Sequence, residues 1–249
     1  YWTGIEALLR GIALWAPHLG ERGWAATKRL RVYLDRGKDL NAYYDRASLS
    51  FFHDVAGGRT IHSGESPDVV THELGHAILD ALQPALWDVM STEAAAFHES
   101  FGDLSALLCG LELQTLREAV LTETGGHLFR SSRLSRVAES LGWAIRQSRP
   151  DLVAPDALRN AVNAFFYRPP SALAPSGPDA QLTSEPHSFS RVFTGGAFEA
   201  MGLMLAGAAK KPTEKHLLAV ARDFAILLVR AVQHAAIVPA YFSQGAAEM

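Results

Sequence analysis

The sequence contains very little cysteine, with Cys109 as the one cysteine among 249 residues. A lone thiol excludes an intrachain disulfide. Its neighbours in the stretch ALLCGL are apolar, which predicts a buried, inert thiol rather than a nucleophile. The absence of disulfides fits a cytosolic protein but also many bacterial secreted enzymes, so cysteine content does not decide the compartment.

The sequence also lacks a strong excess of either positive or negative charge, and it lacks long apolar runs. The formal net charge is −3 and no run of like charges occurs, so nothing favours nucleic acid or an anionic membrane as a partner. The apolar stretch 197–209 is too short to span a bilayer, and the stretch 224–242 is interrupted by Arg230, His234 and Pro239. We expect no membrane span and predict that both stretches are buried helices.

The chain begins at Tyr1 without a charged segment, apolar run and cleavage site in succession, so we expect any signal or pro-segment to lie outside this sequence. Its 48% hydrophobic and 20% charged residues are typical of a globular, core-forming protein. A length of 249 residues is enough for one large domain or for two lobes that share a cleft.

Residues 1–84 are predicted to form a mixed α/β lobe. Apolar residues recur at helical spacing over 4–20, with Pro17 and Gly20 at the end. The stretch 29–37 is strand-like, and 41–58 is rich in aromatic and β-favouring residues and ends at a Gly-Gly turn. A sheet is therefore expected before residue 66.

A helix is predicted to begin at the sequence Ser66-Pro67-Asp68. This stretch supplies a capping hydroxyl, a proline in the first turn and an acid at the positive end of the helix dipole. Pro84 follows Gln83 and should end the helix there.

Residues 85–249 are predicted to form a mainly helical lobe, which makes the fold class α+β with a cleft between the lobes. The exception is 167–186, with five prolines in twenty residues, which predicts a long loop leading to His187. The helices are expected over 93–113, 134–146, 157–166, 189–209 and 213–237.

The stretch VTHELGHA places His72, Glu73 and His76 within five positions. Residues four apart lie on one face of a helix, so the two histidines can chelate one ion. Glu73, turned by about 100° from His72, can flank that ion without binding it. The pattern H-E-x-x-H on a helix is typical of zinc hydrolases for this reason. Two unrelated helix histidines remain the alternative until a third ligand is found.

A catalytic zinc needs a third protein ligand. The extended motif with a third histidine is excluded, because Leu79 and Leu82 occupy its last two positions. The stretch FHESFGDLSALL instead offers Glu99, with Asp103 one turn later on the same face. Asp103 can accept the free ring N–H of a ligating histidine. His98 is a rival ligand, but it points about 100° away from that face.

Together these stretches resemble the thermolysin-like zinc metallopeptidases, or gluzincins. Four stretches follow the order found in that family: 41–44 (NAYY), 68–76 (DVVTHELGH), 99–103 (ESFGD) and 187–190 (HSFS). They extend over most of the chain.

The resemblance implies a role for each matched residue. His72, His76 and Glu99 would bind one catalytic Zn²⁺, and Glu73 would be the general base. Beyond these, Asp103 would orient a zinc-binding histidine, Asn41 and Ala42 would hold the substrate backbone, and His187 would stabilise the oxyanion of the transition state.

Three family positions differ here. The tyrosine beside the oxyanion falls at about Trp87, which can donate only its ring N–H. The acid that supports the catalytic histidine falls at Leu182, with Glu185 or Asp179 as substitutes. The substrate-binding arginine is best matched by Arg130, with Arg168 as a rival.

Calcium ligands are a fourth difference. Asp68 occupies the position of one family calcium ligand, but the next expected acid falls at about Gly110. We expect Asp68 to act as a helix-capping acid and expect no double calcium site.

By this resemblance the chain is expected to be a zinc endopeptidase that hydrolyses an extended peptide or protein with Glu73-activated, zinc-bound water, and the family favours secretion. One alternative is a protease of the same scaffold that is specific for one target protein. The other is an inactive zinc-binding module, which is disfavoured because structural zinc sites are usually closed and rich in cysteine.

Overall fold

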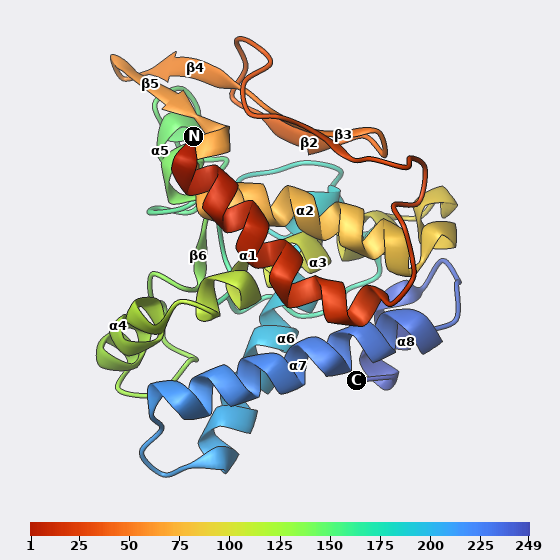
Figure 1. The fold of residues 1–249 in the computed structure, drawn as a ribbon. Coiled ribbons are helices and arrows are strands. Elements are labelled where there is room, and N and C mark those ends of the chain that lie inside the picture. Colours follow the sequence, from red (N-terminus) through yellow and green to blue (C-terminus); the bar gives the residue numbers. More distant parts are fainter.

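The computed structural model describes all residues, 1–249, and confirms the α+β class (Figure 1). The strands are short and form one three-stranded sheet and two antiparallel pairs. They are β1 (Arg31–Tyr33), β2 (Ala42–Tyr44), β3 (Ser48–Phe51), β4 (His53–Ala56), β5 (Arg59–His62), β6 (Arg136–Val137) and β7 (Arg159–Asn160). In the three-stranded sheet β3 is central, with β1 parallel and β2 antiparallel to it.

Eight α-helices make up most of the molecule. They are α1 (Trp2–Leu19), α2 (Pro67–Leu82), α3 (Thr92–Leu111), α4 (Gln114–Thr124), α5 (Glu139–Arg146), α6 (Pro186–Ala208), α7 (Glu214–His234) and α8 (Tyr241–Ala247). Three short 3₁₀ turns cover 63–65, 84–88 and 170–172. Figure 1 shows β2–β5 at one end of the molecule and α6–α8 at the other, with α2 and α3 between them. No helix is long and apolar enough to cross a membrane.

Helix α2 begins where the sequence predicts and is buried along nearly its whole length. Asp68 stabilises its start, because one carboxylate oxygen accepts from the Val69 N–H at 3.0 Å and the other accepts from the Ala138 N–H at 2.5 Å. The Asp68 carboxylate therefore acts at the helix start as expected, and it joins α2 to the segment before α5. The Ser66 hydroxyl, expected to cap the helix, donates to Asp68 Oδ1 instead.

Two glycines allow α2 and α3 to cross closely. A Cβ atom at Gly75 would lie 2.9 Å from the Gly102 Cα, and one at Gly102 would lie 2.7 Å from the ring of His72. Any side chain at either position would force the helices apart. The crossing thereby brings the histidines of α2 next to α3.

Helix α1 packs against this crossing of α2 and α3. Trp15 is fully buried, packs against Phe101 of α3 and donates its ring N–H to Ser105 Oγ at 3.0 Å. Ser105 in turn donates to the Thr71 carbonyl of α2 at 2.9 Å. One chain of hydrogen bonds thus connects α1, α3 and α2. Cys109 is buried as predicted.

A single hydrophobic core extends from α1 to α8 and crosses residue 84 without a break. At the α3 end of this core, the buried carboxylate of Glu93 accepts from the Tyr167 hydroxyl and from the Phe242 N–H, both at 2.9 Å. Glu93 therefore ties the proline-rich segment 167–186 to α8. The division into lobes at residue 84 remains a prediction.

The helix expected over 157–166 is absent, and Arg159–Asn160 within it forms β7 instead. Asn160 Oδ1 accepts from the Val162 N–H at 2.9 Å, and Asn163 Oδ1 accepts from the Phe165 N–H at 3.0 Å. Such side-chain bonds to the nearby backbone compete with helix formation. The helix expected over 134–146 is likewise shortened to α5, because Ala138 before it adopts a φ of 55°.

Candidate metal centre

His72 and His76 project from the same face of α2, with ring centroids 4.8 Å apart. Together with Glu73 they form a buried group whose potential ligand atoms all lie within 4.8 Å of one another. The spacing of the motif predicts this convergence, and helix α2 provides it.

Glu99 of α3 faces both histidines. Its Oε2 lies 3.4 Å from His72 Nε2, and its Oε1 lies 3.7 Å from His76 Nε2. Glu99 Oε2 is buried and has no hydrogen-bond partner. A buried carboxylate oxygen without a partner is costly, whereas a cation between the three side chains would satisfy it. The residues present therefore fit a divalent metal ion.

The other ring nitrogen of His72 is turned toward Asp103. His72 Nδ1 lies 3.0 Å from Asp103 Oδ1, which leaves Nε2 directed at Glu99. Burial alone would raise the pKa of Asp103, but the adjacent Arg159 guanidinium and His72 hold it well below its usual range. Asp103 therefore stays ionised and can fix the orientation of the ring.

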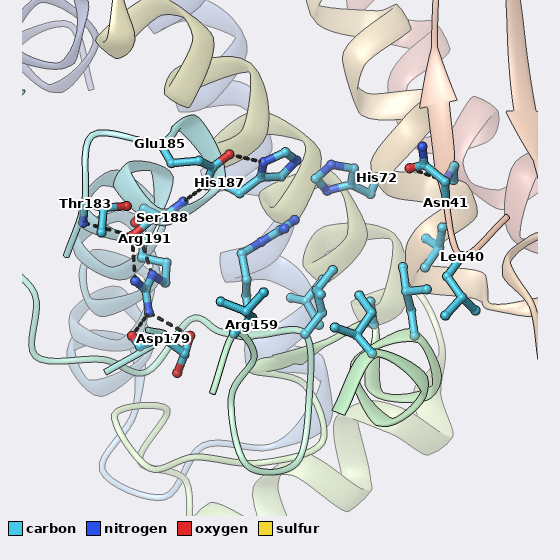
Figure 2. Close-up of a pocket in the computed structure, with 18 of the residues that line it drawn as sticks. Leu40, Asn41, His72, Arg159, Asp179, Thr183, Glu185, His187, Ser188 and Arg191 are labelled. Carbon is cyan, nitrogen blue, oxygen red and sulfur yellow. Dashed lines mark hydrogen bonds and ion pairs between the residues drawn. The ribbon is translucent and has the colours of Figure 1, made fainter. Parts of the chain in front are cut away.

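Arg159 is a pocket residue that the sequence analysis does not select. It donates to both oxygens of Asp103, at 3.0 and 2.7 Å, from β7. Figure 2 shows its guanidinium pointing toward the space between His187 and His72. The signal in the sequence is an arginine flanked by apolar residues in ALRNAV, since a buried arginine requires an acidic partner.

The two arginines selected from the sequence lie elsewhere. Arg130 is exposed, and its guanidinium donates to the Thr124 carbonyl at 3.3 Å. Arg168 is exposed as well. Neither lines the pockets beside His72 and Glu73, whereas Arg159 does. Arg159, and neither Arg130 nor Arg168, is therefore the arginine that lines a pocket at His72 and Glu73.

His187 occupies the first turn of α6 and points at the same carboxylate. Its Nε2 lies 3.3 Å from Glu99 Oε2, and its Nδ1 lies 2.5 Å from Glu185 Oε1 (Figure 2). Glu185 also accepts from the Ser188 N–H at 2.9 Å and so caps the helix. Of the two substitutes considered for Leu182, Glu185 is the one that contacts His187; Asp179 pairs with Arg191 instead.

Glu73 lies beside this group without a direct ion pair. Burial raises the pKa of its carboxyl to about 7, although the neighbouring His72 acts in the opposite direction. A carboxyl group with a pKa near neutrality can both accept and release a proton at physiological pH. Glu73 is suited to proton transfer for this reason.

Two pockets meet at His72, Glu73 and His187. One, of about 470 Å³, is bordered by Asn41, Ala42 and Trp87. In it Trp87 packs edge-on against Tyr44 and His98. Strand β2 lies at the edge of its sheet, so its outer side can pair with another extended chain.

The second pocket, of about 430 Å³, continues past Arg159 (Figure 2). Its wall is largely apolar and includes Val69, Val137, Leu141 and Leu158. Asn41 and Ala42 border both pockets.

No protein-family model, no curated protein and no solved structure matches the chain.

The centre combines three potential metal ligands, a buried carboxyl group near neutral pKa, and two cationic or polar donors that face the same space. His72, His76 and Glu99 offer the ligand atoms. Three protein ligands leave a coordination position free for water or substrate, which is the arrangement of catalytic zinc sites. The arrangement is capable of metal-assisted hydrolysis.

Proposed function

We propose that the chain is a zinc-dependent metalloendopeptidase. The observation that carries the proposal is the position of Glu99. Its two oxygens face Nε2 of His72 and Nε2 of His76 in a buried pocket, and Oε2 has no hydrogen-bond partner there. Two imidazoles and one carboxylate are a donor set suited to Zn²⁺.

In the proposed reaction, Glu73 moves the proton. A zinc ion held by His72, His76 and Glu99 would polarise a substrate carbonyl and lower the pKa of water at the open position. Glu73 would take a proton from the attacking water and then deliver it to the leaving amine. Its pKa of about 7 suits both directions of transfer.

Arg159 and His187 would stabilise the negative charge that develops on the carbonyl oxygen. The Nε and one Nη atom of Arg159 are bound to Asp103, so the other Nη can donate to substrate. His187 is held by Glu185 with its Nε2 directed into the pocket. Donors fixed before the reaction need no reorganisation during it, which is the main source of their effect.

The substrate would be an extended polypeptide paired with the free edge of β2. Asn41 and Ala42 lie where β2 begins, next to the pocket that contains His72 and Glu73. Main-chain pairing along an edge strand is independent of sequence, and the apolar wall of the second pocket would favour an apolar side chain. The two-lobed, thermolysin-like arrangement with a cleft over the metal belongs to this proposal.

The test compares the wild type with Glu73→Gln, which keeps the size of the side chain and removes its ability to accept a proton. We expect the wild type to hydrolyse unfolded casein and short peptides, and Glu73→Gln to retain about one zinc per chain while activity falls by a factor of about 10²–10⁴. Glu199→Gln is the matched control, because Glu199 is an exposed acid on α6.

Hydrolysis of one protein but not of unfolded casein would support the target-specific alternative. Bound zinc without hydrolysis of casein, of short peptides or of any other protein tested would favour the non-enzymatic module. Equal activity in Glu73→Gln and the wild type, or no zinc in either, would overturn the proposal.

A further inference from the structure

A second cluster of potential metal ligands lies apart from this centre, on the β4–β5 hairpin. His53 opens β4 and His62 closes β5, and the two are directly opposite in the antiparallel register. Residues opposite each other in such a pair project from the same face of the sheet. Their rings accordingly lie near each other, with centroids 5.1 Å apart.

Asp35, in the loop after β1, completes the cluster. His53 Nδ1 lies 2.7 Å from Asp35 Oδ1, and His62 Nδ1 lies 3.9 Å from Asp35 Oδ2. The potential ligand atoms of the three residues lie within 4.8 Å of one another. Atoms bound to one zinc ion at about 2.0–2.2 Å are themselves separated by roughly 3–4 Å, so small side-chain movements would complete a site.

A simple ion pair between His53 and Asp35 does not account for His62. The Nδ1 atom of His62 is inaccessible to solvent and has no hydrogen-bond partner. It nevertheless faces the same carboxylate as His53. A buried ring nitrogen is normally satisfied, and a metal ion shared with Asp35 and His53 would satisfy it.

The other contacts of Asp35 leave room for this role. The Gly37 N–H donates to Oδ1 at 3.1 Å and the Tyr1 hydroxyl donates to Oδ2 at 3.1 Å. Both hold the carboxylate in place, and each carboxylate oxygen can accept more than one partner. Figure 1 shows the N-terminus beside β5, where the Tyr1 ring packs edge-on against His62.

We infer that Asp35, His53 and His62 form a second site for a divalent metal of the zinc class. Two imidazoles and one carboxylate favour Zn²⁺, Co²⁺, Ni²⁺ or Cu²⁺ over Ca²⁺ and Mg²⁺, which prefer oxygen ligands. The three side chains are each about a quarter exposed, at 26–29%. Water would fill the remaining coordination positions, and the site would exchange metal more readily than the buried centre.

A metal ion at this site would hold in place the segment that precedes strand β2. The segment between Asp35 and Asn41 already pairs with β4, through the His53 N–H to the Gly37 carbonyl at 3.0 Å and the Asp39 N–H to the His53 carbonyl at 2.9 Å. A metal ion joining Asp35 to the hairpin would add an attachment at the start of this segment. None of the three ligands lines the pockets at His72 and Glu73.

The test counts zinc ions bound by the full chain after removal of metal with a chelator. Equilibrium dialysis against Zn²⁺ is carried out on the wild type, His62→Gln and Asp35→Asn. We expect each variant to bind one equivalent fewer than the wild type. His127→Gln is the control, because His127 is exposed and belongs to neither cluster, and it should bind as the wild type does.

This comparison does not depend on the buried centre. If His72, His76 and Glu99 bind no zinc, the wild type should bind one equivalent and His62→Gln none. In ¹H–¹⁵N spectra of the imidazoles, addition of Zn²⁺ should shift the signals of His53 and His62 together. Equal stoichiometry in the wild type, His62→Gln and Asp35→Asn, or unchanged signals of His53 and His62, would overturn the inference.

Discussion

Asp103 and Arg159 form an ion pair behind His72 that is almost closed to solvent, with side chains 2% and 9% exposed. Removal of one partner from such a pair leaves a buried charge without compensation, which costs far more than the pair itself contributes. Asp103 Oδ1 also lies 3.0 Å from Nδ1 of His72. The pair therefore connects the stability of the fold to the geometry of the metal centre.

Arg159→Met, which keeps much of the volume of the side chain, should destabilise the protein by about 3–5 kcal/mol. Zinc affinity should fall by about 10–100-fold, because Asp103 would no longer be held in place. Urea unfolding and zinc competition with a chelator measure the two effects. Arg168→Met changes an exposed arginine and should alter stability by about 0.5 kcal/mol or less. Similar losses of stability and zinc affinity in both variants would show that the ion pair between Asp103 and Arg159 contributes nothing specific to either.

His187 has a more specific expected effect. Its substitution by glutamine should lower kcat/KM by about 10²–10³-fold, as removal of one oxyanion donor does. Zinc content should stay at that of the wild type, since the proposed ligands are His72, His76 and Glu99. Atomic absorption and peptide hydrolysis measure the two quantities, with His127→Gln as control. Loss of zinc in His187→Gln would identify His187 as a fourth ligand and contradict its role toward the substrate.

At the scale of elements, the centre depends on how closely α2 and α3 cross. Gly75 and Gly102 lie at this crossing, and the ring of His72 occupies the space that a side chain at 102 would need. The candidate ligands come from two helices, so a small change in helix separation alters their mutual distances.

Gly102→Ala should displace the ring of His72 and weaken zinc binding by at least about tenfold. Alanine has a higher helix propensity than glycine, so any loss of affinity arises from the contact with His72 and not from the helix itself. Gly196→Ala in α6 is the matched control. No atom beyond the neighbouring residues and the backbone of its own helix lies within 4 Å of the added Cβ, and the protein should become about 0.5–1 kcal/mol more stable. Unchanged zinc affinity in Gly102→Ala would refute the steric account.

At the scale of the whole molecule, one continuous core joins the strands, α2 and the C-terminal helices. Trp15 is fully buried near one side of that core, whereas Trp87 is partly exposed beside the metal centre. Regions that share a core unfold together. The part before residue 84 is therefore not expected to unfold separately from the rest.

Thermal unfolding should show one transition by both circular dichroism and tryptophan fluorescence. Zinc at 100 times its Kd should stabilise the folded chain by about 2.7 kcal/mol, because the ion binds only the folded state. A chelator should remove this gain and lower the midpoint. Two separate transitions would contradict the single core, and a midpoint unaffected by zinc and chelator would contradict binding to the folded state.

The parts of the site that follow from local periodicity could be predicted from the sequence. His72 and His76 lie one turn apart, as do Glu99 and Asp103, so their relative positions depend only on helix geometry. Arg159 could not be found in this way. It reaches Asp103 from a two-residue strand whose formation depends on pairing with β6. A helix is expected there, but asparagine side chains bind the nearby backbone N–H groups and so compete with helix formation.

The position of Glu93 determines when one contact of the fold can form during synthesis of the chain. Its two carboxylate oxygens are shared between Tyr167, at the start of the loop that leads to His187, and Phe242 in α8. During translation, residues 72, 76 and 99 leave the ribosome well before residue 242. In a nascent chain the loop that leads to α6 therefore gains its attachment to α8 through Glu93 only after residue 242 has been synthesised.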